Sequence, residues 1–97
     1  MNTPHVLLDI STNGLTELEN LPPALRSKTI EKLKHLAVMP LDVFQASYEK
    51  EKLLGISAPG CVVYAVRVAA NSETEIVAVC AVQGQLVRIA SFRQVSV

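Results

Sequence analysis

The sequence contains no tryptophan and only two tyrosines and two phenylalanines in its 97 residues. Hydrophobic residues nevertheless make up 49% of the chain, so we expect a core built from leucine, isoleucine and valine. Nine basic residues are balanced by nine acidic ones. A net charge of zero argues against a strong nonspecific nucleic-acid-binding protein, but it leaves room for a local basic patch. The length suits a single domain spanning residues 1–97.

The two cysteines, Cys61 and Cys80, stand in apolar runs without a CxxC spacing, and both histidines lie far from them in the sequence. We therefore expect buried free thiols on strands, no metal site and no cofactor. The first residues lack the charged segment and the long apolar run of a signal peptide. No apolar stretch approaches the ~20 residues of a membrane helix. These features predict a cytoplasmic protein without membrane contact.

The first half of the chain combines one apolar run with helical periodicity. Residues 5–11 precede the turn signal STNG and predict a short strand, whose poor alternation indicates burial on both faces. Leu15 and Leu18, with Leu21 as an optional third member, mark a first short helix with Thr16 as its cap. This helix is either separate from the next one or the first part of one long kinked helix. A second helix is expected to carry Pro23 in its first turn and to end before Pro40. Its apolar stripe comprises Leu25, Ile30, Leu33, Leu36 and Ala37.

The second half of the chain is dominated by β-branched runs. Residues 41–60 are mixed in character and are interpreted as a loop with a short helical turn. Three runs follow, at residues 61–70, 76–82 and 86–92, joined by the polar turn NSETE and the tight turn QGQ. Short connections imply antiparallel neighbours. The sequence predicts an α+β fold of order β-α-α-β-β-β, with a mainly antiparallel sheet and a helical hairpin packed on one face. The edge at which the first strand joins the sheet stays open.

The arginines of the last strands are assigned to faces by their alternation. In the run CVVYAVRV, Arg67 and Tyr64 point to opposite faces. In LVRIASFR, a regular pleat puts Arg88 and Arg93 on opposite faces, and a β-bulge near Ser91 would be needed to align them. We expect Arg67 and Arg88 on one open face, where they act either as phosphate ligands or as ordinary solvated side chains.

The order of elements and several passages resemble the RelE/ParE superfamily of toxins from toxin–antitoxin pairs. LPPALRSKTIEKLKHLAVMP is similar to the second helix of that family, and KLLG followed by YAVRV is similar to its glycine and its strand with an arginine. EIVAVCAVQGQLVRIASFRQV resembles the closing hairpin, with SFRQV in the place of the final polar motif. The resemblance covers almost the whole chain. It implies a small sheet that cups a positively charged surface, and a cognate antitoxin as partner.

RelE-like members cleave messenger RNA in the ribosomal decoding site, whereas ParE-like members act on DNA gyrase. The resemblance to the first group implies a ribosome-dependent endoribonuclease that inhibits translation, with the ribosome and messenger RNA as further partners. Arginines stabilise the charge that develops on phosphate during such cleavage. The catalytic residues expected on this basis are Arg67, Arg88 and Arg93, and the RNA-binding residues are Lys50, Lys52 and Tyr64. Oligomerisation stays open.

The sequence departs from that family where acid–base chemistry is expected. Glu75 stands where the family commonly has a cation, and Ser91 and Phe92 stand where it often has histidine or tyrosine beside the arginine. No general base is evident unless the fold brings Glu75 or Tyr64 to the arginines. The alternative function is therefore a noncatalytic protein-binding module, either gyrase-directed or inactive, in which Tyr64 packs in the core or at its rim.

Overall fold

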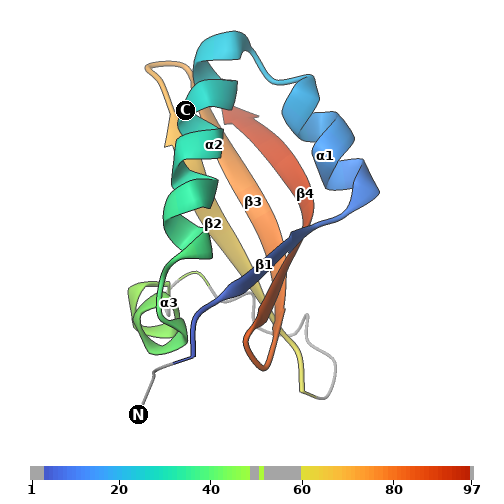
Figure 1. Ribbon diagram of the computed structural model, residues 1–97. Helices are drawn as coiled ribbons and strands as arrows, with labels where there is room; N and C mark the ends of the chain where they lie inside the picture. Colours follow the sequence, from blue (N-terminus) through green and yellow to red (C-terminus); the bar gives the residue numbers. More distant parts are fainter. Residues whose placement is uncertain (1–3, 49–50, 52–59, 97) are drawn as a thin grey trace.

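The computed structural model describes residues 4–48, 51 and 60–96 (Figure 1). Its elements are β1 (Leu7–Ile10), α1 (Thr12–Glu19), α2 (Pro23–Ala37), α3 (Leu41–Ser47), β2 (Val62–Ala70), β3 (Thr74–Gln83) and β4 (Leu86–Ser96). The predicted α+β class is confirmed. A full helix, α3, occupies part of the segment for which the sequence predicts only a helical turn.

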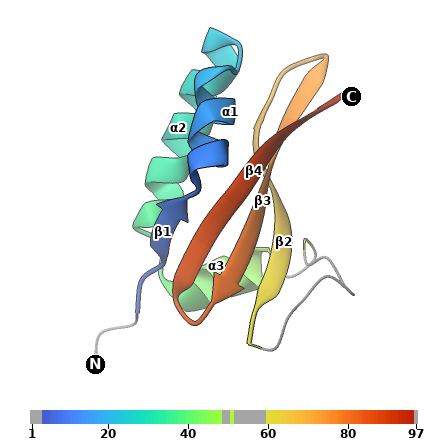
Figure 2. The same cartoon turned by 90° about the vertical axis from the view of Figure 1, so that its right-hand side faces the viewer.

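The strands form one sheet in the order β1-β4-β3-β2. β2, β3 and β4 are antiparallel neighbours, whereas β1 pairs with β4 in parallel, which settles the edge that the first strand takes. Figure 2 shows α1 and α2 on one face of the sheet and α3 near its lower end. The other face is called the open face below. Its side chains include Asp9, Val63, Ala65, Arg67, Glu75, Val77, Val79, Ala81, Arg88 and Arg93.

The N-cap residues of the helices are serine or proline, but the predicted cap of the first helix is wrong. Ser11 is the N-cap of α1, and its Oγ accepts a hydrogen bond from the Gly14 N–H at 3.0 Å. Thr16 lies inside the helix, where its hydroxyl donates to the carbonyl oxygen of Thr12. Pro23 is the first residue of α2, as predicted. Proline is tolerated there because an N–H at that position would have no acceptor within the helix.

The prediction that the first strand is buried on both faces is also wrong. β1 is an edge strand, and Leu7 on its open face is 54% exposed. Val6, just before the strand, is buried in the core, and its N–H donates to the carbonyl oxygen of Met39 at 3.0 Å. Leu8 and Ile10, on the other face of the strand from Leu7, are partly buried and pack against the core. One apolar face is enough for a strand that only one helical layer covers.

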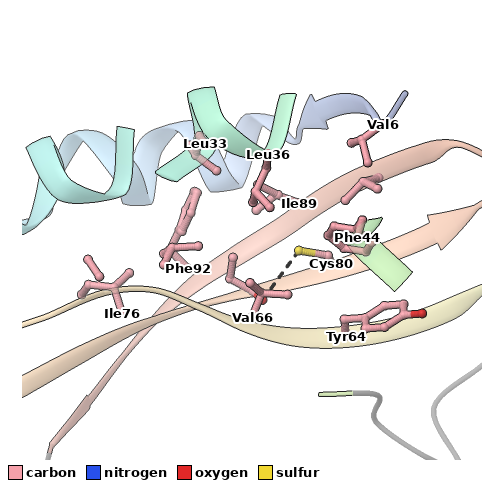
Figure 3. Packing of buried hydrophobic residues seen from close by; sticks show 14 of the residues in the cluster. Val6, Leu33, Leu36, Phe44, Tyr64, Val66, Ile76, Cys80, Ile89 and Phe92 are labelled. Atoms are coloured by element: carbon pink, nitrogen blue, oxygen red, sulfur yellow. Dashed lines mark hydrogen bonds between the residues drawn. The ribbon is translucent and has the colours of Figure 1, made fainter. Parts of the chain in front are cut away.

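The core lies between the sheet and the helices and is mostly aliphatic (Figure 3). Phe44 of α3 is fully buried, and its ring packs edge-on against Tyr64 with centroids 5.4 Å apart. Cys80 is fully buried on β3, and this burial raises the pKa of its thiol to about 12. Cys61 is only partly buried, and both thiols are free.

Candidate functional site

A β-bulge interrupts the pairing of β3 with β4. Cys80 pairs with Ile89 and Val79 pairs with Ser91, so Ala90 has no partner residue across the strand. The extra residue reverses the alternation that follows it. Phe92 turns into the core, where it is 3% exposed, and Arg93 turns to the open face. This is the bulge that the sequence requires if Arg88 and Arg93 are to share a face.

The N-cap of α1 and a residue within the helix hold the bulge in place. Ser11 Oγ donates to the carbonyl oxygen of Ala90 at 2.8 Å, and the Phe92 N–H donates to Glu17 Oε1 at 3.1 Å. The helix also contacts the backbone of β4 there, because a Cβ at Gly14 would stand 3.4 Å from the carbonyl oxygen of Ile89. Ser11 and Glu17 therefore supply hydrogen-bonding partners to the part of β4 that lies beyond the end of β1.

Arg67 and Arg93 lie in one row across three strands of the open face. Val77 of β3 pairs with Arg67 of β2 on one side and with Arg93 of β4 on the other. Two strand spacings separate the arginine backbones by about 10 Å. Such a distance allows two long guanidinium side chains to approach one phosphate group from opposite sides.

Glu75 lies on the same face, two residues before Val77 on β3, and pairs with Arg67. Its Oε1 accepts a hydrogen bond from Arg67 Nη1 at 2.8 Å. This hydrogen bond is the main cause of the raised pKa of Arg67, and the negative charges of Glu75 and Glu51 add to it. The fold thus brings Glu75 to Arg67. The sequence leaves open whether Glu75 lies close enough to the arginines to act as a general base, and this contact meets that condition. We call Arg67, Glu75 and Arg93 the arginine row.

Arg88 lies on the same face but outside the arginine row. It pairs with Ala81, four residues along β3 from Val77, which corresponds to roughly 13 Å. Its Nε donates to Asp9 Oδ2 on the neighbouring β1 at 2.9 Å. The sequence predicts that Arg67 and Arg88 lie together; they share a face but are not adjacent.

The residues predicted to bind RNA are not part of the arginine row. Tyr64 faces the helices and is 2% exposed, so its ring packs in the core and offers no free face for a base. Lys50 and Lys52 lie outside the described residues. Within the described part of the chain, no group of three or more histidine, cysteine, aspartate or glutamate side chains is placed to hold a metal ion.

A groove adjoins the arginine row where the end of α3 meets the sheet. It has a volume of about 540 Å³, and its lining includes Lys32 of α2, Tyr48 and Glu51 after α3, and Arg67 and Glu75 of the sheet. The ammonium group of Lys32 lies 5.6 Å from the centre of the Tyr48 ring. Sequence periodicity alone does not reveal this groove, because its lining comes from separate elements.

The resemblance to RelE/ParE toxins depends on short passages and on the order of elements. None of the helices that the structure describes is both long enough and apolar enough to span a membrane. Comparisons of the chain with protein-family models, with curated proteins and with solved structures found no match, so membership of that superfamily stays a prediction.

Proposed function

We propose that this chain is the toxin component of a toxin–antitoxin pair and cleaves messenger RNA on the ribosome through its arginine row. The observation that carries the proposal is the bulge at Ala90, which turns Arg93 onto the face that bears Arg67 and Glu75. Two guanidinium groups beside a carboxylate supply the charge stabilisation and the base that cleavage by a ribose hydroxyl requires. The proposal places the chain in the cytoplasm, with its antitoxin as partner.

Each residue of the arginine row has a separate role in the proposed reaction. The second carboxylate oxygen of Glu75, Oε2, accepts the proton of the ribose 2′-hydroxyl while O2′ bonds to phosphorus. Arg67 and Arg93 stabilise the negative charge that develops on the phosphoryl oxygens. The bond from phosphorus to the 5′ oxygen breaks, and a water molecule protonates the leaving oxygen. The products are a 2′,3′-cyclic phosphate and a 5′-hydroxyl end.

The proposal is tested by inducing the chain in a bacterial host, measuring growth and mapping the 5′ ends of messenger RNA in the same culture. We expect growth arrest together with new cleavage ends within reading frames. Arg67→Ala and Arg93→Ala should each lower cleavage by about 100-fold or more, because each removes a group that stabilises developing charge. The thermal midpoint should change little, because both side chains are exposed.

The matched control is Arg88→Ala. Arg88 is the same residue type on the same face, and like Arg67 it pairs with a carboxylate, but it lies outside the arginine row. The variant should therefore cleave as the unaltered chain does. Equal cleavage by all three arginine variants would refute the assigned roles of Arg67 and Arg93.

A noncatalytic protein-binding module is the second candidate, and the apolar character of the open face favours it. Between the charged residues this face carries Val63, Ala65, Val79 and Ala81, all partly exposed. Both α1 and α2 lie on the opposite face of the sheet (Figure 2). Partly exposed apolar sheet residues are typical of surfaces that a partner protein covers. Growth arrest without RNA cleavage would favour this candidate, with DNA gyrase as the first target to test.

A further inference from the structure

The groove beside the arginine row combines features that a nucleotide needs. Two cations, Lys32 and Arg67, and two carboxylates, Glu51 and Glu75, line it together with the Tyr48 ring. Its volume of about 540 Å³ lies within the usual range of small-molecule sites, about 300–1,000 Å³. The lining that the structure describes therefore has balanced charges and offers separate positions for an anion, for hydrogen-bond donors and for a planar ring.

The anion position is defined by the two cations. Lys32 and Arg67 also line a second hollow, of about 450 Å³. Among the residues that the structure describes, these two alone line both hollows, so both cations are accessible from either hollow. An ammonium and a guanidinium that face the same space favour a phosphate group, which accepts hydrogen bonds from both.

The remaining lining defines the position of a base. Ala65 and Val77 form an apolar floor, and Tyr48 contributes an aromatic wall whose ring is braced by Phe44 with centroids 5.0 Å apart. Planar bases pack favourably against such apolar and aromatic surfaces. Glu51 is exposed at the groove, where its carboxylate is an acceptor only.

We propose that this groove binds a guanine nucleotide unit, with its phosphate between Lys32 and Arg67 and its base between Tyr48 and Glu51. Guanine presents two adjacent donors, N1–H and the N2 amino group, which a carboxylate accepts as a pair. Adenine, cytosine and uracil each present a single donor group on the same edge, so one carboxylate discriminates against them. The inference deepens the proposed function, because it names the nucleotide that lies beside the scissile phosphate.

The test is a titration of the full ¹⁵N-labelled chain with GMP, AMP, UMP and inorganic phosphate, followed through backbone amide shifts. We expect GMP to bind at least about ten-fold more tightly than AMP or UMP, with shifts around Tyr48 and Arg67. Lys32→Gln should weaken GMP binding about ten-fold, and Glu51→Ala should remove the preference for GMP over AMP. Lys34→Gln and Glu73→Ala are the matched controls, since both residues are exposed and lie outside the groove lining.

The outcomes separate this inference from the proposed function. Equal affinity for GMP and AMP, or inorganic phosphate binding as tightly as GMP, overturns the guanine assignment. If the chain binds GMP but cleaves no messenger RNA, the groove assignment stands and the proposed nuclease activity is refuted. If the chain cleaves messenger RNA but GMP does not bind at the groove, the proposed nuclease activity stands and the groove assignment is overturned.

Discussion

Deletion of Ala90 is the sharpest test of how the sheet orients the arginine row. Ala90 is the unpaired residue of the bulge, so its removal leaves Val79 opposite Ser91 in a regular ladder. Phe92 then stays in the core and Arg93 stays on the open face. The deletion removes the hydrogen bond from Ser11 Oγ to the Ala90 carbonyl oxygen. We therefore expect the free energy of unfolding to fall by only about 1 kcal/mol.

Deletion of Arg88 shortens the same strand by one residue and serves as the matched control. Arg88 is exposed, so removing its side chain alone costs little stability. To restore pairing, however, either Val87 or Ile89 must turn from the core to the open face, and both are fully buried. Emptying or overfilling such a core position typically costs about 2–5 kcal/mol. The Arg88 deletion should therefore be clearly more destabilising than the Ala90 deletion.

Urea unfolding followed by circular dichroism measures both deletions under the same conditions. The chain without Ala90 should also keep the cleavage activity of the arginine row, because Arg93 still pairs across β3 with Val77. If the Ala90 deletion destabilises the protein as much as the Arg88 deletion, the bulge is not a tolerated extra residue. The account of how Arg93 reaches the open face is then wrong.

Three further predictions concern the support of β4 and the buried thiol. Glu17→Ala should lower the free energy of unfolding by about 1–2 kcal/mol, because the Phe92 N–H loses its acceptor. Glu19→Ala is the control, since Glu19 is exposed. Equal effects of the two substitutions on stability would contradict the role of Glu17 in supporting β4. Cys80 should resist alkylation at pH 8 until the protein is unfolded, whereas Cys61 reacts in the native state. Because folding raises the pKa of Cys80 from 9.0 to about 12, the unfolded state loses its thiol proton first. Its contribution to stability is therefore complete below pH 9 and falls by about 1.4 kcal/mol per unit between pH 9 and pH 12, a slope that Cys80→Ala should remove.

The sequence predicts the strands better than it predicts their exact pairing. The alternation in β2 correctly separates Arg67 from Tyr64, because one face of that strand is buried and the other is not. Gly84 correctly marks the hairpin between β3 and β4, where its φ of +60° suits glycine. Both features depend on neighbours in the sequence, which local patterns describe well.

The bulge departs from the regular alternation by which the sequence assigns residues to the two faces of the sheet. Regular alternation after Ile89 would expose Phe92 and bury Arg93, which is unfavourable for both side chains. Ile89 and Phe92 are three positions apart, whereas residues on one face of a regular strand are an even number of positions apart. If both apolar side chains are buried, this spacing indicates an extra residue between them. The groove carried no such signal, because Lys32, Tyr48 and Arg67 come from three elements that only the folded chain brings together.

The parallel pairing of β1 with β4 has a consequence for the order in which the chain folds. β2, β3 and β4 are joined by short turns, so the meander that holds Arg67 and Glu75 requires little loop closure. The hydrogen bond from Ser11 to Ala90 joins residues that are 79 positions apart. We therefore expect β1 and α1 to dock late, onto a meander that has already formed. The bulge that orients Arg93 then gains its hydrogen bonds to Ser11 and Glu17 only in the last folding step, so destabilising mutations in α1 should slow the gain of activity more than the gain of β-structure.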